Sequence, residues 1–342
     1  MEGVYDGFAY LGGQHATGLR DVTSDLAALD GEGWWAMVVD YEGKVTCARF
    51  DRVRESPLPA PAASWHGPRP DQWRSSLDRA AYERGVRAIR AYIEQGEVYQ
   101  ANLCRILTAP VPADADPLAL AARLAAGNPA PYAAVIQVPG LSVVSASPEL
   151  YLSRDGDTVE SRPIKGTGAT AGDLLDKDYA ENVMIVDLVR NDLGRVAAVG
   201  SVEVPSLCAV EEHPGLVHLV STVRARLAPG AGWPELFAAT FPPGSVTGAP
   251  KSSALRIINE LEPAPRGPYC GAVGWVDADR RRAALAVGIR TFWISALAHG
   301  DDEIRFGTGA GITWGSDPGR EWLETELKAA RLIALASTGG TE

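Results

Sequence analysis

The sequence predicts an α/β (α+β) fold built on antiparallel sheets. Apolar runs of strand length occur in clusters separated by Pro and Gly turns, and helix-patterned stretches lie between these clusters rather than after every strand. Such grouping fits antiparallel sheets better than a regular alternation of strand and helix. The chain has 342 residues, of which 46% are hydrophobic and 22% charged, so it can bury a large core in one body or in a main domain with a smaller companion.

The first 55 residues are expected to form a short N-terminal subdomain. Its strongest element is WWAMVVD, Trp34 to Asp40, an apolar run of strand length. Residues 56–72 follow as a linker, because PLPAPAASWHGPRP contains five prolines in fourteen residues and proline disrupts regular structure. Residues 73–338 are then expected to form the main domain.

The main domain begins with a predicted amphipathic helix from Trp73 to Glu94. Strands are expected at Tyr132 to Val138, Leu141 to Ala146 and Leu150 to Ser153, separated by Pro and Gly turns. These three segments predict the start of a sheet.

The second half of the chain continues with a helix over KDYAENVMIVDLVR, Lys177 to Arg190. Its interior from Val183 to Val189 is almost entirely apolar, so we expect it to be buried on most sides. The remaining expected elements are strands at Val217 to Arg224, Gly271 to Asp277 and Ala283 to Ile294, a hairpin turn at DADRRR between the last two strands, and a final helix from about Arg320 to Ala336.

The charge balance excludes several classes of partner. The 43 acidic and 32 basic residues give a net charge of −11, which disfavours non-specific binding to nucleic acid or to anionic membranes. The first twenty residues lack a secretory pattern and no apolar stretch is long enough to span a membrane, so the protein is expected in the cytoplasm. Cys47, Cys104, Cys208 and Cys270 are scattered without a CxxC pair, which predicts reduced thiols rather than disulfides or a zinc site.

Two glycine-rich stretches do not match nucleotide-binding loops. In GSVTGAPKSS, residues 244–253, two residues separate Gly248 from Lys251, whereas a phosphate loop has glycine directly before lysine. In GTGAGITWG, residues 307–315, the glycines do not form GxGxxG and no helix follows directly. A dinucleotide site is therefore disfavoured.

The stretch GSVTGAPKSSALRII instead predicts a glycine turn that leads into a helix. Pro250 lies near the expected helix start, and Ser252 or Ser253 are candidate caps. Backbone N–H groups at such a start could bind a carboxylate, although a plain turn explains the stretch equally well.

Two pairs of acidic residues occur at helical spacing. Asp178 and Glu181 lie at the start of one predicted helix, and Glu321 and Glu324 at the start of the last, so each pair shares a helix face. Acidic residues also favour helix N-termini for structural reasons, and Glu324 can pair with Lys328. If the two pairs meet, they form an oxygen-rich site suited to Mg²⁺. The sequence by itself leaves that meeting open.

The stretch RPIKGTGAT, residues 162–170, places Lys165 where a predicted strand runs into a turn. A lysine beside a glycine is most often a solvated turn residue. On this stretch alone, that structural explanation prevails.

Nine stretches are informative as an ordered set: GEVYQANL (96–103), SPELYL (147–152), ESRPIKGT (160–167), AENVMIVDLVRNDLGRV (180–196), VHLVS (217–221), GSVTGAPK (244–251), YCGAVG (269–274), IRT (289–291) and GAGIT (309–313). In this order they resemble the chorismate-utilising enzymes, which include anthranilate synthase component I, aminodeoxychorismate synthase component I, isochorismate synthase and salicylate synthase. The resemblance extends from roughly residue 75 to the end, and nine ordered stretches make it highly specific.

This resemblance implies a two-layer antiparallel β-sheet sandwich with outer helices, the anthranilate synthase component I-like fold, with the active site between the layers. Residues 73–338 would be the chorismate-binding catalytic domain. Members of the family bind chorismate with Mg²⁺ at its ring carboxylate. By resemblance, Glu181 and Glu324 are the expected direct metal ligands, and Asp178 and Glu321 act through bound water. The family usually has Glu where this chain has Asp178.

The residue that stands at the position of Lys165 differs between members of this family. The stretch that reads PIKGT here resembles that of aminodeoxychorismate synthases, whereas anthranilate synthases, and commonly isochorismate and salicylate synthases, read PIAGT. Replacement of the 4-hydroxyl by an amine with retention requires either a protected face or two successive inversions, and a lysine nucleophile makes the second route possible. Lys165 would add at C2 as the 4-hydroxyl leaves, and ammonia would add at C4 and expel the lysine. Glu149 of SPELYL matches the family's general acid, and burial or a nearby cation must lower the lysine pKa.

The resemblance implies further substrate contacts. Gln100 stands where isochorismate-type members have a lysine that activates water, and an amide cannot act as that base. His218 resembles the family histidine near the departing hydroxyl, and Arg290 the arginine that holds a substrate carboxylate. The remaining expected contacts are Thr167, Gly309, Ala310, Gly311 and Lys251.

Together these features predict aminodeoxychorismate synthase component I, which converts chorismate and ammonia to 4-amino-4-deoxychorismate for 4-aminobenzoate, folate or related secondary metabolism. The chain contains no GxCxG nucleophile stretch of a glutamine amidotransferase, so a separate glutaminase subunit is the expected source of ammonia. Two alternatives stay open: an anthranilate, isochorismate or salicylate synthase, and a chorismate-binding subunit without turnover.

Overall fold

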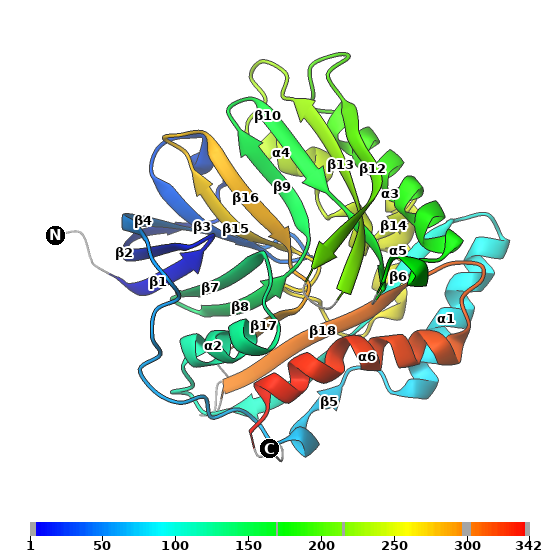
Figure 1. Ribbon diagram of the computed structural model, residues 1–342, viewed down its shortest axis with the longest axis horizontal. Helices are drawn as coiled ribbons and strands as arrows, with labels where there is room; N and C mark the ends of the chain where they lie inside the picture. Colours follow the sequence, from blue (N-terminus) through cyan, green and yellow to red (C-terminus); the bar gives the residue numbers. More distant parts are fainter. Residues whose placement is uncertain (1–4, 169, 214–215, 296–301, 339–342) are drawn as a thin grey trace.

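The structure is a computed structural model that describes residues 5–168, 170–213, 216–295 and 302–338. Six α-helices surround the strands in this part of the chain (Figure 1): α1 (Arg79–Glu94), α2 (Pro117–Gly127), α3 (Asp176–Gly194), α4 (Trp233–Thr240), α5 (Lys251–Leu261) and α6 (Pro318–Ala336). Short 3₁₀ turns lie at η1 (Leu26–Asp30), η2 (Pro70–Gln72), η3 (Ala171–Asp173) and η4 (Gly244–Val246).

The strands of this part form one hydrogen-bonded network, in which every pairing is antiparallel. They are β1 (Tyr5–Leu11), β2 (Gln14–Thr23), β3 (Trp34–Val39), β4 (Val45–Glu55), β5 (Arg74–Ser75), β6 (Gln100–Val111), β7 (Tyr132–Val138), β8 (Leu141–Ser147), β9 (Leu150–Asp155), β10 (Thr158–Arg162), β11 (Ile164–Gly168), β12 (Glu203–His213), β13 (Leu216–Arg226), β14 (Gly248–Ala249), β15 (Ala272–Asp277), β16 (Arg282–Val287), β17 (Thr291–Ser295) and β18 (Asp302–Ile312).

The pairings follow a continuous path from β12 to β6. The path runs through β13, β10, β9, β16, β15, β3, β4, β2, β1, β7, β8, β17 and β18. The strands of residues 1–55 therefore pair on both sides with strands of the later chain. Figure 1 shows the network bent into two layers, with α3 outside the β12–β13 end and α6 outside β18. The predicted two-layer antiparallel fold with outer helices is confirmed.

The first helix begins later than predicted. A start at Trp73 is wrong, because Arg74 and Ser75 pair with β6 as the short strand β5. The helix starts after Asp78, whose carboxylate accepts a hydrogen bond from the backbone N–H of Ala81 at 2.7 Å. This N-cap satisfies one of the free donors at the helix end.

The predicted strand from Ala283 to Ile294 is interrupted. β16 ends at Val287 and β17 begins at Thr291, so a single strand is the wrong interpretation. Arg290, between them, has a left-handed backbone with φ of 52°, which breaks the extended conformation. The chain here turns from β9 towards β8, the neighbours of β16 and β17.

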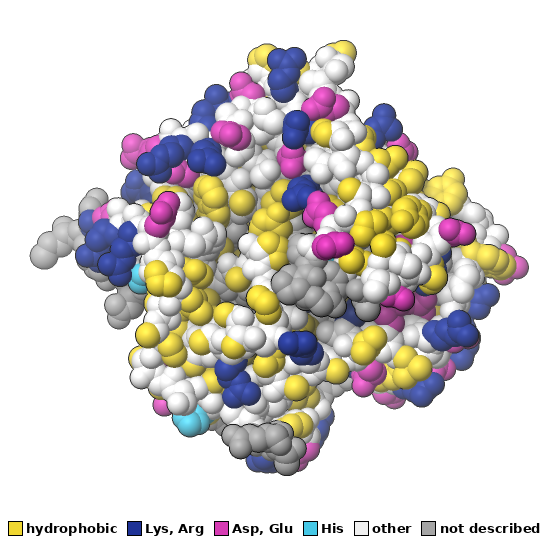
Figure 2. All heavy atoms as spheres, in the orientation of Figure 1, with side chains coloured by type: hydrophobic (Ala, Val, Ile, Leu, Met, Phe, Trp, Pro, Cys, Tyr) yellow, Lys and Arg dark blue, Asp and Glu magenta, His cyan; other side chains and the backbone are white. Residues whose placement is uncertain are grey.

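The α3 helix is less enclosed than predicted. Ile185, Val186 and Val189 are buried, but the Val183 side chain is 48% exposed, so the expectation of burial on most sides is wrong there. The helix packs one face against β13, and its other face is open. Figure 2 shows hydrophobic side chains gathered on the surface over α3 and β12.

The other predicted strands, the hairpin turn and the final helix are confirmed to within about two residues at each end. None of the helices in the described ranges has both the length and the apolar character that crossing a bilayer requires.

The close pairing of β15 and β16 yields a test of the fold. A β-carbon at Gly274 would lie 2.7 Å from the Cα of Leu285 and closer still to the carbonyl oxygen of Ala284. Gly274→Ala should therefore lower the free energy of unfolding by about 1–3 kcal/mol, as measured by urea denaturation. Gly194→Ala is the matched control, because nothing lies near that position, and it should change stability by less than about 1 kcal/mol. Equal stabilities of the two variants would contradict this packing.

Candidate active site

Lys165 lies at an irregularity in β11. The register between β11 and β13 shifts between Ile164 and Thr167, and Gly166 there has a left-handed φ of 77°. A β-bulge of this kind redirects the side chain next to it. The Lys165 amine donates a hydrogen bond to the backbone carbonyl of Ser245 at 3.2 Å. The lysine is thus no solvated turn residue, because it points to the loop that precedes α5.

Burial lowers the pKa of the Lys165 amine, although the nearby carboxylates of Glu181 and Glu149 oppose this effect. A lower pKa increases the fraction of neutral amine, which is the nucleophilic form. The environment of Lys165 therefore favours nucleophilic chemistry over a fixed surface charge.

Glu149 occupies the connection between β8 and β9, where its side chain is 4% exposed. Its backbone carbonyl accepts a hydrogen bond from Val287 N–H at 3.0 Å, which ties the connection to β16. Burial raises the carboxyl pKa from 4.5 to about 7, partly offset by the Ser245 hydroxyl, the Lys165 charge and the Ile164 N–H. A carboxyl group with a pKa near neutrality can act as a general acid.

Gln100 contributes an unsatisfied amide from β6. The side chain is fully buried, and neither its nitrogen nor its oxygen has a hydrogen-bond partner among the described residues. Buried polar groups of this kind are rare and often belong to ligand sites. The β6–β18 pairing places Gly311 opposite Asn102, two residues along β6, and a β-carbon at Gly311 would overlap the Gln100 amide nitrogen.

The neighbouring residues of β18 alternate between the two faces of the β6–β18 pair. Ala310 is buried on the opposite face, in the core cluster that contains Ala101 and Leu103, and the carbonyl of Gly309 accepts a hydrogen bond from the Lys328 amine at 3.1 Å. A β-carbon at Gly309 would lie 2.7 Å from the Leu103 carbonyl oxygen. The small residues at 309 and 311 therefore let β18 approach β6 closely.

The two acidic pairs lie close enough for their charges to interact. Burial raises the pKa of Glu181, and the Asp178 and Glu324 charges add to the rise. Burial likewise raises the pKa of Glu321, with the Glu324 charge as a further cause. Burial also acts on Glu324, but the Lys328 ammonium 2.6 Å away outweighs it and lowers that pKa.

These carboxylates supply the oxygen ligands that a divalent cation needs, but they do not converge on one point. Within the described ranges, no three His, Cys, Asp or Glu side chains come together tightly enough to hold a metal ion. Lys328 forms an ion pair with Glu324, and the Asp178 carboxylate accepts a hydrogen bond from Leu175 N–H at 2.8 Å. Half-buried carboxylates that repel one another nevertheless fit Mg²⁺, since a bound cation compensates their charge.

Arg290 presents an unpaired cation. Its guanidinium is half-buried and has no hydrogen bond or ion pair with any described residue, and burial lowers its pKa. An arginine without an internal partner is suited to an anionic group of a ligand.

His218 lies on β13 with 3% exposure, in register with Thr167 of β11 and Glu211 of β12. It is therefore on the same sheet segment as Lys165. The Thr167 side chain lies outside the described part of the structure, so only its backbone position is known here.

The Lys251 side chain forms no contact with Lys165 in the structure. Its amine forms a buried ion pair with Asp192 of α3 at 2.5 Å and donates to the Thr240 carbonyl at 3.0 Å. The helix start is also different from the predicted one, because Pro250 is the N-cap residue and neither Ser252 nor Ser253 caps α5. Lys251 thus joins α5 to α3 and α4, and its substrate contact stays a prediction.

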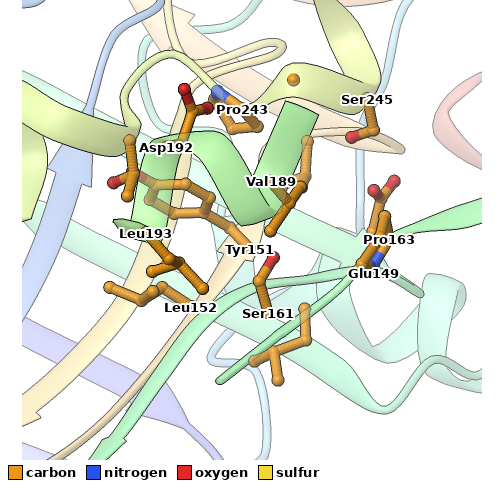
Figure 3. A pocket seen from close by; sticks show the side chains of 14 residues that line it. Glu149, Tyr151, Leu152, Ser161, Pro163, Val189, Asp192, Leu193, Pro243 and Ser245 are labelled. Atoms are coloured by element: carbon orange, nitrogen blue, oxygen red, sulfur yellow. The ribbon is translucent and has the colours of Figure 1, made fainter. Parts of the chain in front are cut away.

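A small cavity extends behind Glu149 (Figure 3). Glu149 and Ser245 lie at one end of it, and Tyr151 and Asp192 lie at the other. It encloses about 20 Å³, enough for roughly one water molecule. The cavity therefore borders the acid but does not accommodate a ring-sized substrate.

The structure adds three residues that the sequence did not single out as functional. Lys328 contacts both Glu324 and Gly309, Ser245 contacts Lys165 and Glu149, and Asn102 donates to the Ser245 carbonyl at 3.4 Å. Lys328 was visible only as an i+4 partner of Glu324. Ser245 and Asn102 lie inside recognisable stretches but show no pattern of their own.

Known proteins resemble this chain along most of its length. A family model described as chorismate binding enzyme matches residues 25–334. Anthranilate synthase component 1 1 of Haloarcula marismortui is 42% identical over 271 residues, which cover 76% of this chain and 54% of that relative. Aminodeoxychorismate synthase component 1 of Klebsiella aerogenes is 36% identical over 318 residues, covering 87% of this chain and 68% of the relative. The crystal structure of anthranilate synthase component I from Streptococcus pneumoniae shares the fold, with a TM-score of 0.78, 23% identity, and coverage of 97% and 93% of the two chains.

This protein belongs to the chorismate binding enzyme family, because the family model matches most of its residues. The chain spans about half the length of the first relative named above.

The buried acid should make stability depend on pH. A group whose pKa rises on folding binds its proton more tightly in the folded state, so stability falls as pH rises from 4.5 to about 7. The loss is about 3 kcal/mol, at about 1.4 kcal/mol per pH unit. Glu149→Gln should remove this loss and make the protein more stable than the unmodified chain at pH 8, as measured by urea unfolding at pH 5 and 8. The exposed Glu55→Gln control should keep the original pH dependence. An unchanged pH dependence in Glu149→Gln would show that this carboxyl titrates normally.

Proposed function

We propose that this protein is the aminating component of an aminodeoxychorismate synthase, which forms 4-amino-4-deoxychorismate from chorismate and ammonia. The observation that carries the proposal is the setting of Lys165. Its amine lies in a half-buried position on the Ser245 carbonyl, and the charge of the buried Glu149 acts on it. Relatives named aminodeoxychorismate synthase component 1 support the proposal at 34–36% identity.

In the proposed reaction, the neutral Lys165 amine attacks C2 of chorismate and forms a C–N bond. Both ring double bonds shift, the C4–O bond breaks, and the hydroxyl leaves as water with the proton of Glu149. Ammonia then attacks C4, both double bonds shift back, and the C2–N bond to Lys165 breaks. The resulting ammonium gives a proton to the Glu149 carboxylate, which restores the acid. A pKa of about 7 lets the same carboxyl donate in the first step and accept in the second.

The remaining site residues bind and orient the substrate in this proposal. The Arg290 guanidinium, which has no partner among the described residues, binds a substrate carboxylate, and the Gln100 amide gains the hydrogen bonds that no described residue gives it. Gln100 has no basic nitrogen, so this position does not activate water. His218 lies on the strand beside Lys165, near the departing hydroxyl.

Glu181 and Glu324 would hold Mg²⁺, with Asp178 and Glu321 acting through bound water. The chemistry that Mg²⁺ supplies in such a site is positive charge for a substrate carboxylate and for the acidic side chains themselves. Lys328 would give up its ion pair with Glu324 and keep its hydrogen bond to the Gly309 carbonyl. Ammonia would come from a separate glutamine amidotransferase subunit.

The second candidate is an anthranilate synthase. The finding that favours it is the 42% identity to a relative named anthranilate synthase component 1 1. The presence of Lys165 opposes it, because the amination of anthranilate synthases takes place with a small residue in the resembling position. Product identity distinguishes the two functions.

Turnover of chorismate with Mg²⁺ and an ammonium salt at mildly alkaline pH should give 4-amino-4-deoxychorismate. Mass spectrometry and conversion to 4-aminobenzoate by an added lyase identify the product. Lys165→Ala should lower the rate at least about a hundredfold, because the nucleophile is lost. Lys44→Ala removes an exposed lysine and should leave the rate unchanged.

Formation of anthranilate would contradict the proposal and identify the protein as an anthranilate synthase. Chorismate binding without any product would identify a non-catalytic subunit.

Mg²⁺ binding can be measured by calorimetry without substrate. Glu181→Gln should weaken it at least about tenfold, because a proposed direct ligand loses its charge. Asp187→Asn on the exposed face of α3 is the matched control and should bind Mg²⁺ as tightly as the unmodified chain. Equal affinities of both variants would exclude Glu181 as a ligand.

A further inference from the structure

Ser245 presents two different groups to the two reacting side chains. Its backbone carbonyl accepts the hydrogen bond from the Lys165 amine at 3.2 Å, and its hydroxyl lies beside the Glu149 carboxyl group at the same end of the cavity (Figure 3), where it lowers the carboxyl pKa. The residue is 7% exposed and lies in η4. Figure 3 shows Ser245 and Glu149 on the same side of the small cavity. One residue therefore contacts both the proposed nucleophile and the proposed acid.

The loop around Ser245 is held in place from several directions. Asn102 of β6 donates its backbone N–H to the Thr247 carbonyl at 2.8 Å and its side-chain amide to the Ser245 carbonyl at 3.4 Å. The buried Arg266 guanidinium donates to the Val246 carbonyl at 2.9 Å. The Thr247 hydroxyl bonds back to the Pro243 carbonyl at 3.2 Å. These bonds leave the loop little freedom to move relative to β6.

We propose that Ser245 is a positioning residue that holds the Glu149 carboxyl group and the Lys165 amine at a fixed separation, through its hydroxyl and its carbonyl respectively. The proposal rests on the amination function proposed above and assigns to it a residue that touches neither bond being broken. Positioning of this kind matters because small displacements of reacting groups cost large factors in rate. The loop bonds from Asn102 and Arg266 make Ser245 rigid enough to serve this purpose.

The hydroxyl also sets the proton affinity of the acid. A hydrogen bond donated to a carboxylate favours its ionised form, so the Ser245 hydroxyl keeps the Glu149 pKa lower than burial alone would make it. The other groups that act on this carboxyl are the Lys165 charge and the Ile164 N–H, and both act in the same direction. Removal of the hydroxyl therefore raises the Glu149 pKa.

Ser245→Ala tests the proposal, because it removes the hydroxyl and keeps the carbonyl for Lys165. The Glu149 pKa should rise by about one pH unit, measured by ¹³C NMR of labelled glutamate carboxyls, with Glu149→Gln to assign the signal. Since the acid must be protonated to act, the alkaline fall of kcat should move to higher pH by a similar amount. At pH values where Glu149 stays protonated, kcat should drop about tenfold, with little change in KM for chorismate.

Three variants make the outcome specific. Ser245→Thr retains a hydroxyl and should restore the Glu149 titration. Ser245→Cys has nearly the same shape with a weaker donor, so it should fold and should raise the pKa by less than Ser245→Ala. Ser161→Ala is the matched control, because Ser161 lines the same cavity with the same 7% exposure and should leave the titration unchanged.

The titration needs no turnover, so it separates this inference from the proposed function. If Ser245→Ala and Ser245→Cys both titrate like the unmodified protein, Ser245 does not hold Glu149 and the inference is wrong. If the Glu149 pKa rises as expected but no amine is formed from chorismate, the contact between Ser245 and Glu149 is established and the proposed amination function is wrong.

Discussion

The pairing of β6 with β18 is the constraint on which the site depends. It joins residues 101–111 to residues 302–312, along the full length of β18. One strand of this pair carries Gln100 and Asn102, and the other carries the Gly309–Gly311 segment, which is followed by α6 with Glu321 and Glu324. Close approach requires glycine, since a β-carbon at position 311 would overlap the Gln100 amide. Hydrogen bonds between segments so distant in the chain are costly in loop entropy, and the many pairs along the strands offset that cost together.

Opposite this pair lies the β11–β13 segment with Lys165 and His218. The loop before α5 lies between the two, because it pairs with β6 through β14 and receives the Lys165 amine. The continuous path of strands from β12 to β6 explains how the ends of one network come to face each other. Charged groups buried between the layers, such as Glu149 and Glu181, are less stable there than in water. The fold accepts this cost at the site, as proteins commonly do where chemistry is required.

Much of this arrangement was predictable from the chain. Apolar runs predicted β3, β7, β8, β9 and β15, and the ordered stretches predicted both the layered fold and the candidate residues. The break at Arg290 was not, because the residues on both sides favour strands and only the turn from β9 to β8 demands a left-handed backbone. The Lys251–Asp192 ion pair also escaped prediction, since each residue alone has many suitable partners and only the packing of α5 against α3 selects one. The open face of α3 was missed because its apolar run has a single charged residue, Asp187, and Val183, one turn earlier on the same face, is exposed although it is apolar.

The buried Gln100 amide has a consequence for selectivity. A buried amide that has no partner among the described residues is costly to leave unsatisfied, so a ligand that hydrogen-bonds to it binds more tightly than one that does not. A compound of similar shape with only carbon and hydrogen at that point would exclude water and leave both amide atoms unpaired. Sites of this type reject such analogues more strongly than an apolar pocket rejects a missing methyl group. Selectivity between ligands at this position therefore depends on the hydrogen bonds that each ligand makes to the Gln100 amide rather than on shape complementarity.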